Sequence, residues 1–354
     1  MKVCKMNYSD LTLEKDTIYL CSLIAMGDTF IFAGLKKKFE NALGHKIVFL
    51  IRKNYVISLQ LYGIKDYIIV DDIDSYNKYS SLFSDFMECG KIYLCHPVFH
   101  KKYHELYFSL RDNHTEIPFL PWFLKFLGLP ADTPLEPIKY IPPVPTDLLE
   151  TIGAPIEKIV LFSPEANSVP PVDAQIWEEK AKELQAEGFT VVSNVILKDN
   201  AVKGTLFVPM TVEQAVALAF HCHAVYSLRS GFCDLIHPVG NRLTVFYPSY
   251  ASLWIYSLNK MFGGTQINEE LHLPSLKSRN AAQNLPSLKS QNAAQKEKWK
   301  IFFFKIIHFR ACRKDGALTR VKFLGIPFLS LKQKGNIVRV RLLGIPFMRI
   351  KKVR

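Results

Sequence analysis

One acidic side chain follows the first apolar run of the sequence, at a place where a carboxylate can do chemistry. The run Thr17–Leu23 has the composition of a buried strand, and Asp28 comes soon after it in a Gly-Asp turn. Side chains beyond the carboxyl ends of parallel strands line the crevice where open α/β sheets bind ligands. A carboxylate there can take a proton from a substrate hydroxyl. The alternative is that Asp28 only caps the start of a helix.

A second candidate site lies in the segment Ser227–Asp234, which reads Ser-Leu-Arg-Ser-Gly-Phe-Cys-Asp. It ends a predicted strand and begins a short predicted helix. The free N–H groups at a helix start bind anions, and the guanidinium of Arg229 can contact a phosphate through two donors. We therefore expect Arg229, Ser230 and Gly231 to bind an anion such as a phosphate group. The alternative is an ordinary helix start with a surface arginine.

A third polar stretch, Phe-Ser-Pro-Glu-Ala-Asn, follows another predicted strand at residues 162–167. The side chains of Ser163 and Asn167, together with backbone N–H groups, could contact an anion such as a phosphate group. Glu165 would not bind phosphate unless a cation intervened. The alternative is a plain polar turn after a strand.

Strands and helices alternate along most of the sequence, and this positions the three candidate segments. The predicted strands are 17–23, 46–51, 67–70, 91–95, 158–162, 190–193, 205–208, 224–227 and 243–246. The predicted helices are 29–43, 172–187, one that starts with a capping box at Thr211 and Gln214, and 231–237. Such alternation predicts right-handed βαβ units and parallel sheets.

Five segments differ in composition and predict the domain organisation. Seven prolines between 130 and 155 predict an extended linker. A 12-residue duplication, Leu-Pro-Ser-Leu-Lys-Ser with its continuation, starts at 273 and again at 285, and Gly-Ile-Pro-Phe occurs at 325 and 344. The predicted parts are 1–129 (first Rossmann-like domain), 130–157 (linker), 158–263 (second Rossmann-like domain), 264–298 (repeat-containing spacer) and 299–354 (basic tail).

The positive charge of the chain is concentrated at its C-terminal end. The formal net charge is +13, and residues 296–354 hold 17 lysines and arginines against two acidic residues. A concentrated positive field attracts polyanions such as anionic lipid headgroups, phosphorylated glycolipids or nucleic acid. Apolar and basic residues interleave from Trp299 to Arg310, a texture that favours an anionic membrane surface.

The composition also predicts the cellular compartment. The seven cysteines are scattered without Cys-x-x-Cys spacing, which argues against a disulfide framework or a structural zinc site. The polar start of the sequence predicts no secretory signal, and no uninterrupted apolar stretch reaches the roughly 18 residues that a spanning helix needs. We expect a cytoplasmic protein, peripheral on the inner face of the plasma membrane.

These features resemble the heptosyltransferase-like lipopolysaccharide glycosyltransferases, which have the GT-B fold. The resemblance lies within about residues 18–248 and is carried by the Gly27-Asp28 pair, the 162–167 segment and the 227–234 segment. It departs from the family pattern at Arg229, where relatives have an aspartate. Residues 162–167 also lack the glycine-rich loop and basic residue that are usual in the family.

The resemblance implies two Rossmann-like domains that face a cleft, followed here by a basic C-terminal appendage. It implies a hexosyl- or heptosyl-type glycosyltransferase that moves a sugar from a nucleotide-sugar donor to a lipopolysaccharide, glycolipid or polysaccharide acceptor. Asp28 would be the catalytic base of an inverting reaction without cofactor or metal. Ser163, Asn167, Arg229, Ser230 and Gly231 would bind the donor diphosphate, while Pro209 and Met210 would hold the nucleobase. No nucleic acid is expected as a partner.

Two alternatives remain open from the sequence. The chain could be a non-catalytic polyanion- or membrane-binding protein with degenerate Rossmann-like domains. It could also be a GT-A glycosyltransferase, because Asp72 and Asp74 form an Asp-x-Asp pattern that can hold a divalent cation; a solvated loop is the simpler interpretation. The His221-Cys222-His223 run does not predict a metal site, since adjacent side chains diverge at a helix-to-strand junction.

Overall fold

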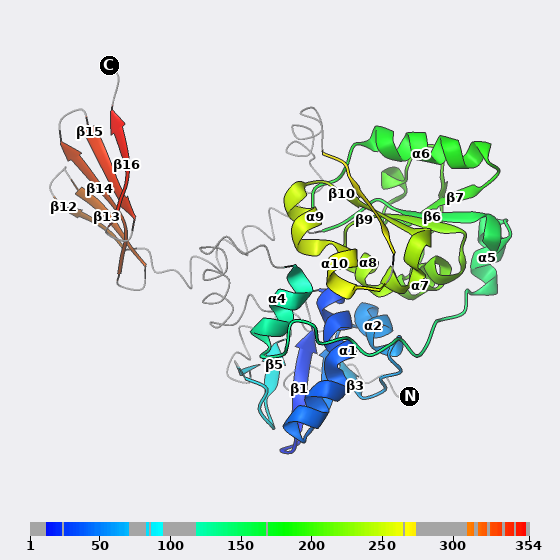
Figure 1. The fold of residues 1–354 in the computed structure, drawn as a ribbon, viewed down its shortest axis with the longest axis horizontal. Coiled ribbons are helices and arrows are strands. Elements are labelled where there is room, and N and C mark those ends of the chain that lie inside the picture. Colours follow the sequence, from blue (N-terminus) through cyan, green and yellow to red (C-terminus); the bar gives the residue numbers. More distant parts are fainter. Residues whose placement is uncertain are drawn as a thin grey trace. The chain divides into compact units, whose positions relative to one another are not determined.

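The computed structural model describes residues 12–22, 25–70, 83–84, 86–94, 118–167, 169–264 and 266–273, together with the backbone of five strands between 310 and 351. The chain forms two compact units, Met1–Ala282 and Gln283–Arg354. The first unit contains two parallel sheets with their helices, and the second contains an antiparallel sheet (Figure 1).

The N-terminal half is built on a five-stranded parallel sheet in the order β3-β2-β1-β5-β4. Its strands are β1 (Thr17–Ser22), β2 (Lys46–Ile51), β3 (Tyr67–Ile69), β4 (Phe83–Ser84) and β5 (Ile92–Leu94). Its helices are α1 (Met26–Leu43), the 3-10 turn η2 (Lys53–Tyr55), α2 (Val56–Gln60) and α4 (Phe119–Phe126). Strand β2 coincides with its predicted range, because every residue after Lys46 is apolar and buried.

The C-terminal half is built on a six-stranded parallel sheet in the order β11-β10-β9-β6-β7-β8. Its strands are β6 (Ile159–Ser163), β7 (Thr190–Ser193), β8 (Leu206–Phe207), β9 (Ala224–Leu228), β10 (Leu243–Tyr247) and β11 (Asn268–Leu271). The order is that of a Rossmann fold, whose topological switch point lies between β6 and β9. Both predicted Rossmann-like halves are thus confirmed.

Helices cover both faces of this second sheet (Figure 1). They are α5 (Thr146–Ile152), α6 (Ala174–Ala186), α7 (Val212–His221), α8 (Gly231–Ile236), α9 (Tyr250–Tyr256) and α10 (Leu258–Phe262), with 3-10 turns η6 (Ile156–Lys158), η7 (Lys198–Asn200) and η8 (His237–Arg242). The predicted capping box is present: Thr211 Oγ1 accepts from Gln214 N and Gln214 Oε1 accepts from Thr211 N. The sheet continues past the predicted boundary at 263, since β11 pairs with β10.

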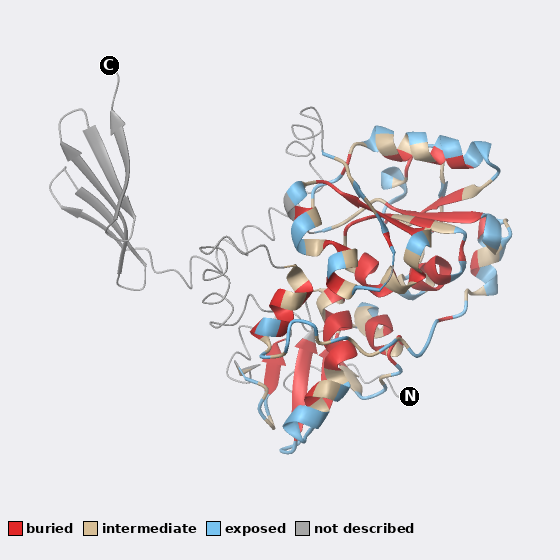
Figure 2. Ribbon diagram, in the orientation of Figure 1, coloured by how far each residue is buried: buried red, intermediate tan, exposed pale blue. Residues whose placement is uncertain are grey.

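The two halves share one continuous hydrophobic core. Buried side chains of β1, α1 and α4 belong to the same cluster as those of α7, α8 and α10. Buried residues lie on these elements in both halves (Figure 2). At the junction, the ring of Phe119 lies 5.4 Å from that of Tyr256, and the ring of Phe30 lies 6.4 Å from that of Phe262. Separate clusters cover the outer faces of the two sheets. The proline-rich linker passes over α1, where Glu136 N donates to Gly34 O.

The C-terminal unit is a five-stranded antiparallel sheet in sequential order. Its strands are β12 (Arg310–Lys314), β13 (Leu318–Phe323), β14 (Ile326–Lys334), β15 (Ile337–Leu342) and β16 (Ile345–Lys351). In each Gly-Ile-Pro-Phe repeat the isoleucine begins a strand that pairs with the strand before it: Phe323 pairs with Ile326 in the first copy, and Leu342 pairs with Ile345 in the second. The 12-residue duplication and the apolar-basic stretch before Arg310 lie outside the described residues.

Candidate functional site

The first turn of α1 holds Asp28 at the carboxyl edge of the N-terminal sheet. The predicted turn at Gly27 and Asp28 is wrong, because the helix already begins at Met26 and both residues belong to it. Ala25 is the N-cap residue, and no side chain caps it. A carboxylate in a first helical turn is favoured by the helix dipole. Asp28 is therefore held on a regular helix, with part of the residue accessible to solvent.

Two glycines let the first turns of α1 and α8 touch. A Cβ atom on Gly27 would overlap Oδ2 of Asp234, and a Cβ atom on Gly231 would lie 2.9 Å from Gly27 N. Because α1 follows β1 and α8 follows β9, the carboxyl edges of the two sheets face each other here. The structure thus brings Asp28 together with the segment 229–234, as the sequence predicts.

Arg229 lies inside this contact and its donors are used by the protein. Nη2 donates to Asp234 Oδ1 at 2.7 Å, Nε donates to Tyr256 O at 2.8 Å and Nη1 donates to Ser230 O. Arg229 is 5% exposed and Asp234 is 6% exposed, so the ion pair is buried. The guanidinium therefore ties the start of α8 to α9. Arg229 would therefore stabilise an anion beside Ser230 through its positive charge, and not through the two direct hydrogen bonds expected from the sequence.

The electrostatics of this cluster set the proton affinity of Asp28. The pKa of Asp28 is raised from 3.8 to about 7: burial is the largest cause, the nearby carboxylate of Asp234 adds to it, and the guanidinium of Arg229 opposes both. Burial likewise raises the pKa of Asp234, against the effect of Arg229. A carboxylate with a pKa near neutrality suits a general base, because it is partly ionised yet holds a proton well.

His237 at the end of α8 stabilises the same contact. Its Nδ1 lies 2.8 Å from Asp234 O, and its ring stacks on Phe262 with 4.0 Å between centroids. The ring of Phe30 from α1 packs edge-on against it. Burial lowers the pKa of His237 to about 4, so the imidazole is neutral at pH 7 and Nδ1 donates to the carbonyl. This histidine is a packing element of the site.

The proposed donor-binding residues lie along the carboxyl edge of the C-terminal sheet. Ser163 ends β6 beside Ser227 of β9, so it flanks the switch point together with Ser230 and Gly231. Asn167 is exposed on the loop after β6. Pro209 and Met210 follow β8 at the far edge of the sheet, two strands away from β6. The structure therefore groups Ser163 with the start of α8, while Pro209 and Met210 stand apart.

Other polar residues singled out in the sequence have separate roles. Glu165 accepts from Ile196 N and Asn200 Nδ2 at 3.1 and 2.5 Å, so it joins two loops at this edge. Cys222 is buried while His221 and His223 are exposed, so the three side chains diverge as predicted. Among the described residues, no group of three His, Cys, Asp or Glu side chains could hold a metal ion. Asp72 and Asp74 lie outside the described residues.

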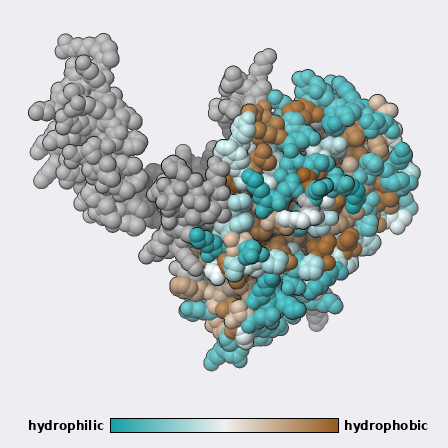
Figure 3. Space-filling view, viewed as in Figure 1, coloured by the Kyte–Doolittle hydropathy of each residue, from teal (hydrophilic) through white to brown (hydrophobic). Residues whose placement is uncertain are grey.

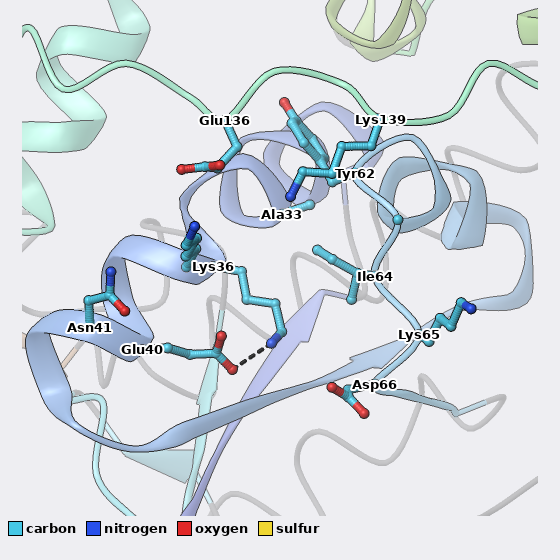
Figure 4. Close-up of a pocket in the computed structure, with 12 residues that line it drawn as sticks. Ala33, Lys36, Glu40, Asn41, Tyr62, Ile64, Lys65, Asp66, Glu136 and Lys139 are labelled. Carbon is cyan, nitrogen blue, oxygen red and sulfur yellow. Dashed lines mark hydrogen bonds and ion pairs between the residues drawn. The ribbon is translucent and has the colours of Figure 1, made fainter.

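An open groove of about 510 Å³ lies on the N-terminal half, away from Asp28. It is bordered by the later turns of α1, the loop after α2 and the linker (Figure 4). Lys36 and Glu40 form an ion pair inside it, and Lys65 and Lys139 also line it. Since α1 rises about 1.5 Å per residue, Lys36 lies about 12 Å along the helix from Asp28. The groove is therefore distinct from the Asp28 cluster.

The described surface is mostly hydrophilic on the face shown in Figure 3, with hydrophobic patches between. Exposed apolar side chains include Tyr250, Trp254 and Ile255 of α9. Among the described residues, none of the helices combines the length and the apolar character needed to cross a bilayer.

Two Rossmann-like halves joined by a proline-rich segment, with a carboxylate at their contact, define a GT-B-type α/β protein. No protein-family model matches the sequence, and no curated protein sequence matches it significantly.

Solved structures similar to this chain include glycosyltransferases. A glycosyl transferase family 9 protein from Veillonella parvula DSM 2008 has 13% identity and a TM-score of 0.49, with 76% of this chain and 91% of that chain covered. The ADP-heptose lps heptosyltransferase II of E. coli has 14% identity and a TM-score of 0.48, with 78% and 99% covered. E. coli heptosyltransferase WaaC with ADP has 12% identity and a TM-score of 0.43, with 76% of this chain and 99% of that chain covered. Likeness at this level assigns no activity, so function rests on the site.

Proposed function

We propose that this protein is a glycosyltransferase that moves a sugar from a nucleotide-sugar donor to a lipopolysaccharide or another surface-glycan acceptor. One observation carries the proposal: Asp28, whose pKa is raised to about 7, lies where the carboxyl edges of two Rossmann-like sheets meet. A strongly perturbed carboxyl group in such a place is a candidate base.

In the proposed reaction, Asp28 takes the proton of an acceptor hydroxyl while the hydroxyl oxygen attacks the anomeric carbon of the donor sugar. The bond from that carbon to the diphosphate breaks, and the nucleoside diphosphate leaves with the electron pair. Attack on the face opposite to the leaving group inverts the anomeric centre. Stabilisation of the leaving charge by fixed dipoles and cations is the expected source of rate acceleration.

The donor side of the proposal uses the edge of the C-terminal sheet. The backbone N–H groups of Ser230 and Gly231 would receive the diphosphate, with the buried charge of Arg229 directly behind them. Ser163 lies at the same switch point, and Asn167 extends from the following loop. Pro209 and Met210 would hold the nucleobase through backbone groups. No metal or cofactor enters this scheme.

The acceptor and the location are proposed from the charge distribution. The acceptor would be a glycolipid or polysaccharide, and the basic tail would hold the enzyme on the inner face of the plasma membrane. The support is the excess of basic residues from 296 to 354. Anionic membrane surfaces attract such segments by about 1 kcal/mol for each lysine or arginine near the surface.

The alternative of a non-catalytic binding protein is favoured by one observation, the closure of Arg229 onto Asp234. A nucleotide screen by thermal shift with UDP, GDP, ADP and CMP separates the two readings when it is combined with a turnover assay. A nucleotide that stabilises the protein, with turnover of the matching nucleotide-sugar, supports the enzyme. Stabilisation without turnover supports the binding protein.

The base assignment is tested by Asp28→Asn. Turnover should be abolished, while stabilisation by the nucleotide should remain, because the side chain lies on the acceptor side. Asp147→Asn is the matched control, since Asp147 is also in the first turn of a helix but is exposed on α5. Normal turnover in Asp28→Asn would remove the assignment.

A further inference from the structure

A second charged side chain of the N-terminal half stands at the same sheet edge as Asp28. Arg52 directly follows β2, whose last residue, Ile51, pairs with Ser22 at the end of β1. Since α1 starts just after β1, Arg52 and Asp28 leave from neighbouring strands in the same direction. Ser58 Oγ of α2 donates to Met26 O and ties the segment after Arg52 to the first turn of α1.

Arg52 carries a donor that no described residue pairs with. Its Nε is buried and has no hydrogen-bond partner in the described part of the chain. The guanidinium carbon lies over the ring of Tyr55 at 5.9 Å from the centroid, which orients the group without satisfying its N–H donors. A buried donor left unpaired costs about 1–3 kcal/mol, and more when the group is charged. A ligand that accepts this hydrogen bond would remove that cost.

Tyr55 connects Arg52 with Asp28. Burial raises the pKa of Tyr55, Arg52 opposes the rise, and the charge of Asp28 adds to it. Both charges therefore act on one phenol. The turn η2, which contains Tyr55, also packs against α7 of the C-terminal half. Arg52 is thus placed near the junction of the halves.

We propose that Arg52 binds an acidic group of the acceptor, a phosphate or a carboxylate, next to the hydroxyl that Asp28 deprotonates. This rests on the proposed function. Guanidinium groups pair with both kinds of anion through parallel N–H donors. Arg52 is partly accessible and can reach such an anion, whereas the neighbouring Lys53 is exposed. An acidic acceptor would be selected over a neutral one by this contact.

The test measures binding of glucose 1-phosphate, glucuronate and glucose to the full chain by calorimetry. The variants are Arg52→Gln, Arg52→Lys and, as matched control, Lys53→Gln. We expect wild type and Lys53→Gln to bind one of the two acids at least tenfold more tightly than glucose. Arg52→Gln should lose this preference and Arg52→Lys should keep part of it. The phosphate and carboxylate probes show which acid is preferred.

Three outcomes would overturn the proposal. One is equal affinity of wild type for the acids and for glucose, another is an unchanged preference in Arg52→Gln, and the third is an equal loss in Lys53→Gln. Arg52→Gln should melt at or above the wild-type temperature, because it removes an unsatisfied cation; a large drop would mark a structural arginine instead. A thermal-shift measurement with nucleotides on the same variants separates this proposal from the proposed function. If no nucleotide stabilises the protein but the acids still bind, the glycosyltransferase function is refuted and the Arg52 anion site is not.

Discussion

Replacing Asp234 with asparagine should move the pH dependence of turnover to lower pH. Asp28 has to be ionised to act as a base, so kcat/KM should rise with pH through a midpoint near 7, the pKa of Asp28. Asp234 raises that pKa and Arg229 lowers it. Asp234→Asn removes the first effect and leaves the guanidinium unpaired, so both changes favour the ionised form of Asp28.

The size of the change follows from Coulomb's law. Two unit charges about 6 Å apart interact by about 2.8 kcal/mol at an effective dielectric constant of 20, which corresponds to about two pKa units. Asp28 is partly accessible to water, so we halve this and expect the midpoint near pH 6. At pH 5 the ionised fraction then rises about ninefold. The plateau at high pH should fall a few-fold, because a weaker base accepts the proton less readily.

The assay is the pH profile of kcat/KM for wild type, Asp234→Asn and Arg229→Gln. Arg229→Gln removes the cation that lowers the pKa of Asp28, so at pH values where Asp234 is ionised its midpoint should move above 7, opposite to that of Asp234→Asn. Loss of packing alone would lower activity in both variants without shifting either midpoint. Shifts in the same direction, or midpoints that stay at the wild-type value, would refute the electrostatic coupling of Asp28 to this ion pair.

Three further predictions follow from the site and the tail. Gly27→Ala should lower kcat about tenfold or more, because its Cβ would overlap Oδ2 of Asp234 and overpacking costs about 1–3 kcal/mol; wild-type kinetics would show that the helix starts do not touch. The raised pKa of Asp28 costs stability that grows as pH rises from about 4 to 7, so urea midpoints should show Asp28→Asn more stable than wild type at pH 8 and equal to it at pH 4. The full chain should co-sediment with vesicles that contain phosphatidylglycerol, and it should dissociate at about 0.5 M salt because salt screens the attraction. Equal binding to neutral vesicles would contradict the role of the tail.

Periodicity predicted most of the fold because each half folds by local rules. Strand β7 has its predicted bounds, and the capping box at Thr211 starts α7 where expected. Right-handed crossovers then leave only a few possible sheet orders. Strand β11 was missed, because Asn268–Leu271 has three polar residues out of four and its edge position leaves them half exposed. A polar edge strand has no apolar run to reveal it.

The site was only half predictable, because its chemistry depends on pairing between elements. The sequence placed Asp28 and the 229–234 segment correctly at two sheet edges. It did not reveal that Asp234 captures the guanidinium of Arg229, although the two lie five residues apart around a helix start. Their pairing depends on how α8 packs against α1 and α9. The sequence around Arg52 contains no recognisable motif. Its unpaired N–H donor can be identified only once the positions of the surrounding hydrogen-bond acceptors are known.

The proton affinity of Asp28 is a property of the contact between the halves rather than of α1 alone. Burial is the largest cause of the raised pKa, followed by Asp234, and Asp234 belongs to α8. A carboxylate in the first turn of an isolated helix would keep a pKa near or below its ordinary value, because the dipole favours the ionised form. Any change that separates Gly27 from Gly231 should therefore weaken the base as well as displace it. In Gly27→Ala, the pH midpoint of the remaining activity should fall below 7 together with the loss of kcat, whereas a displaced but still buried carboxylate would keep its midpoint.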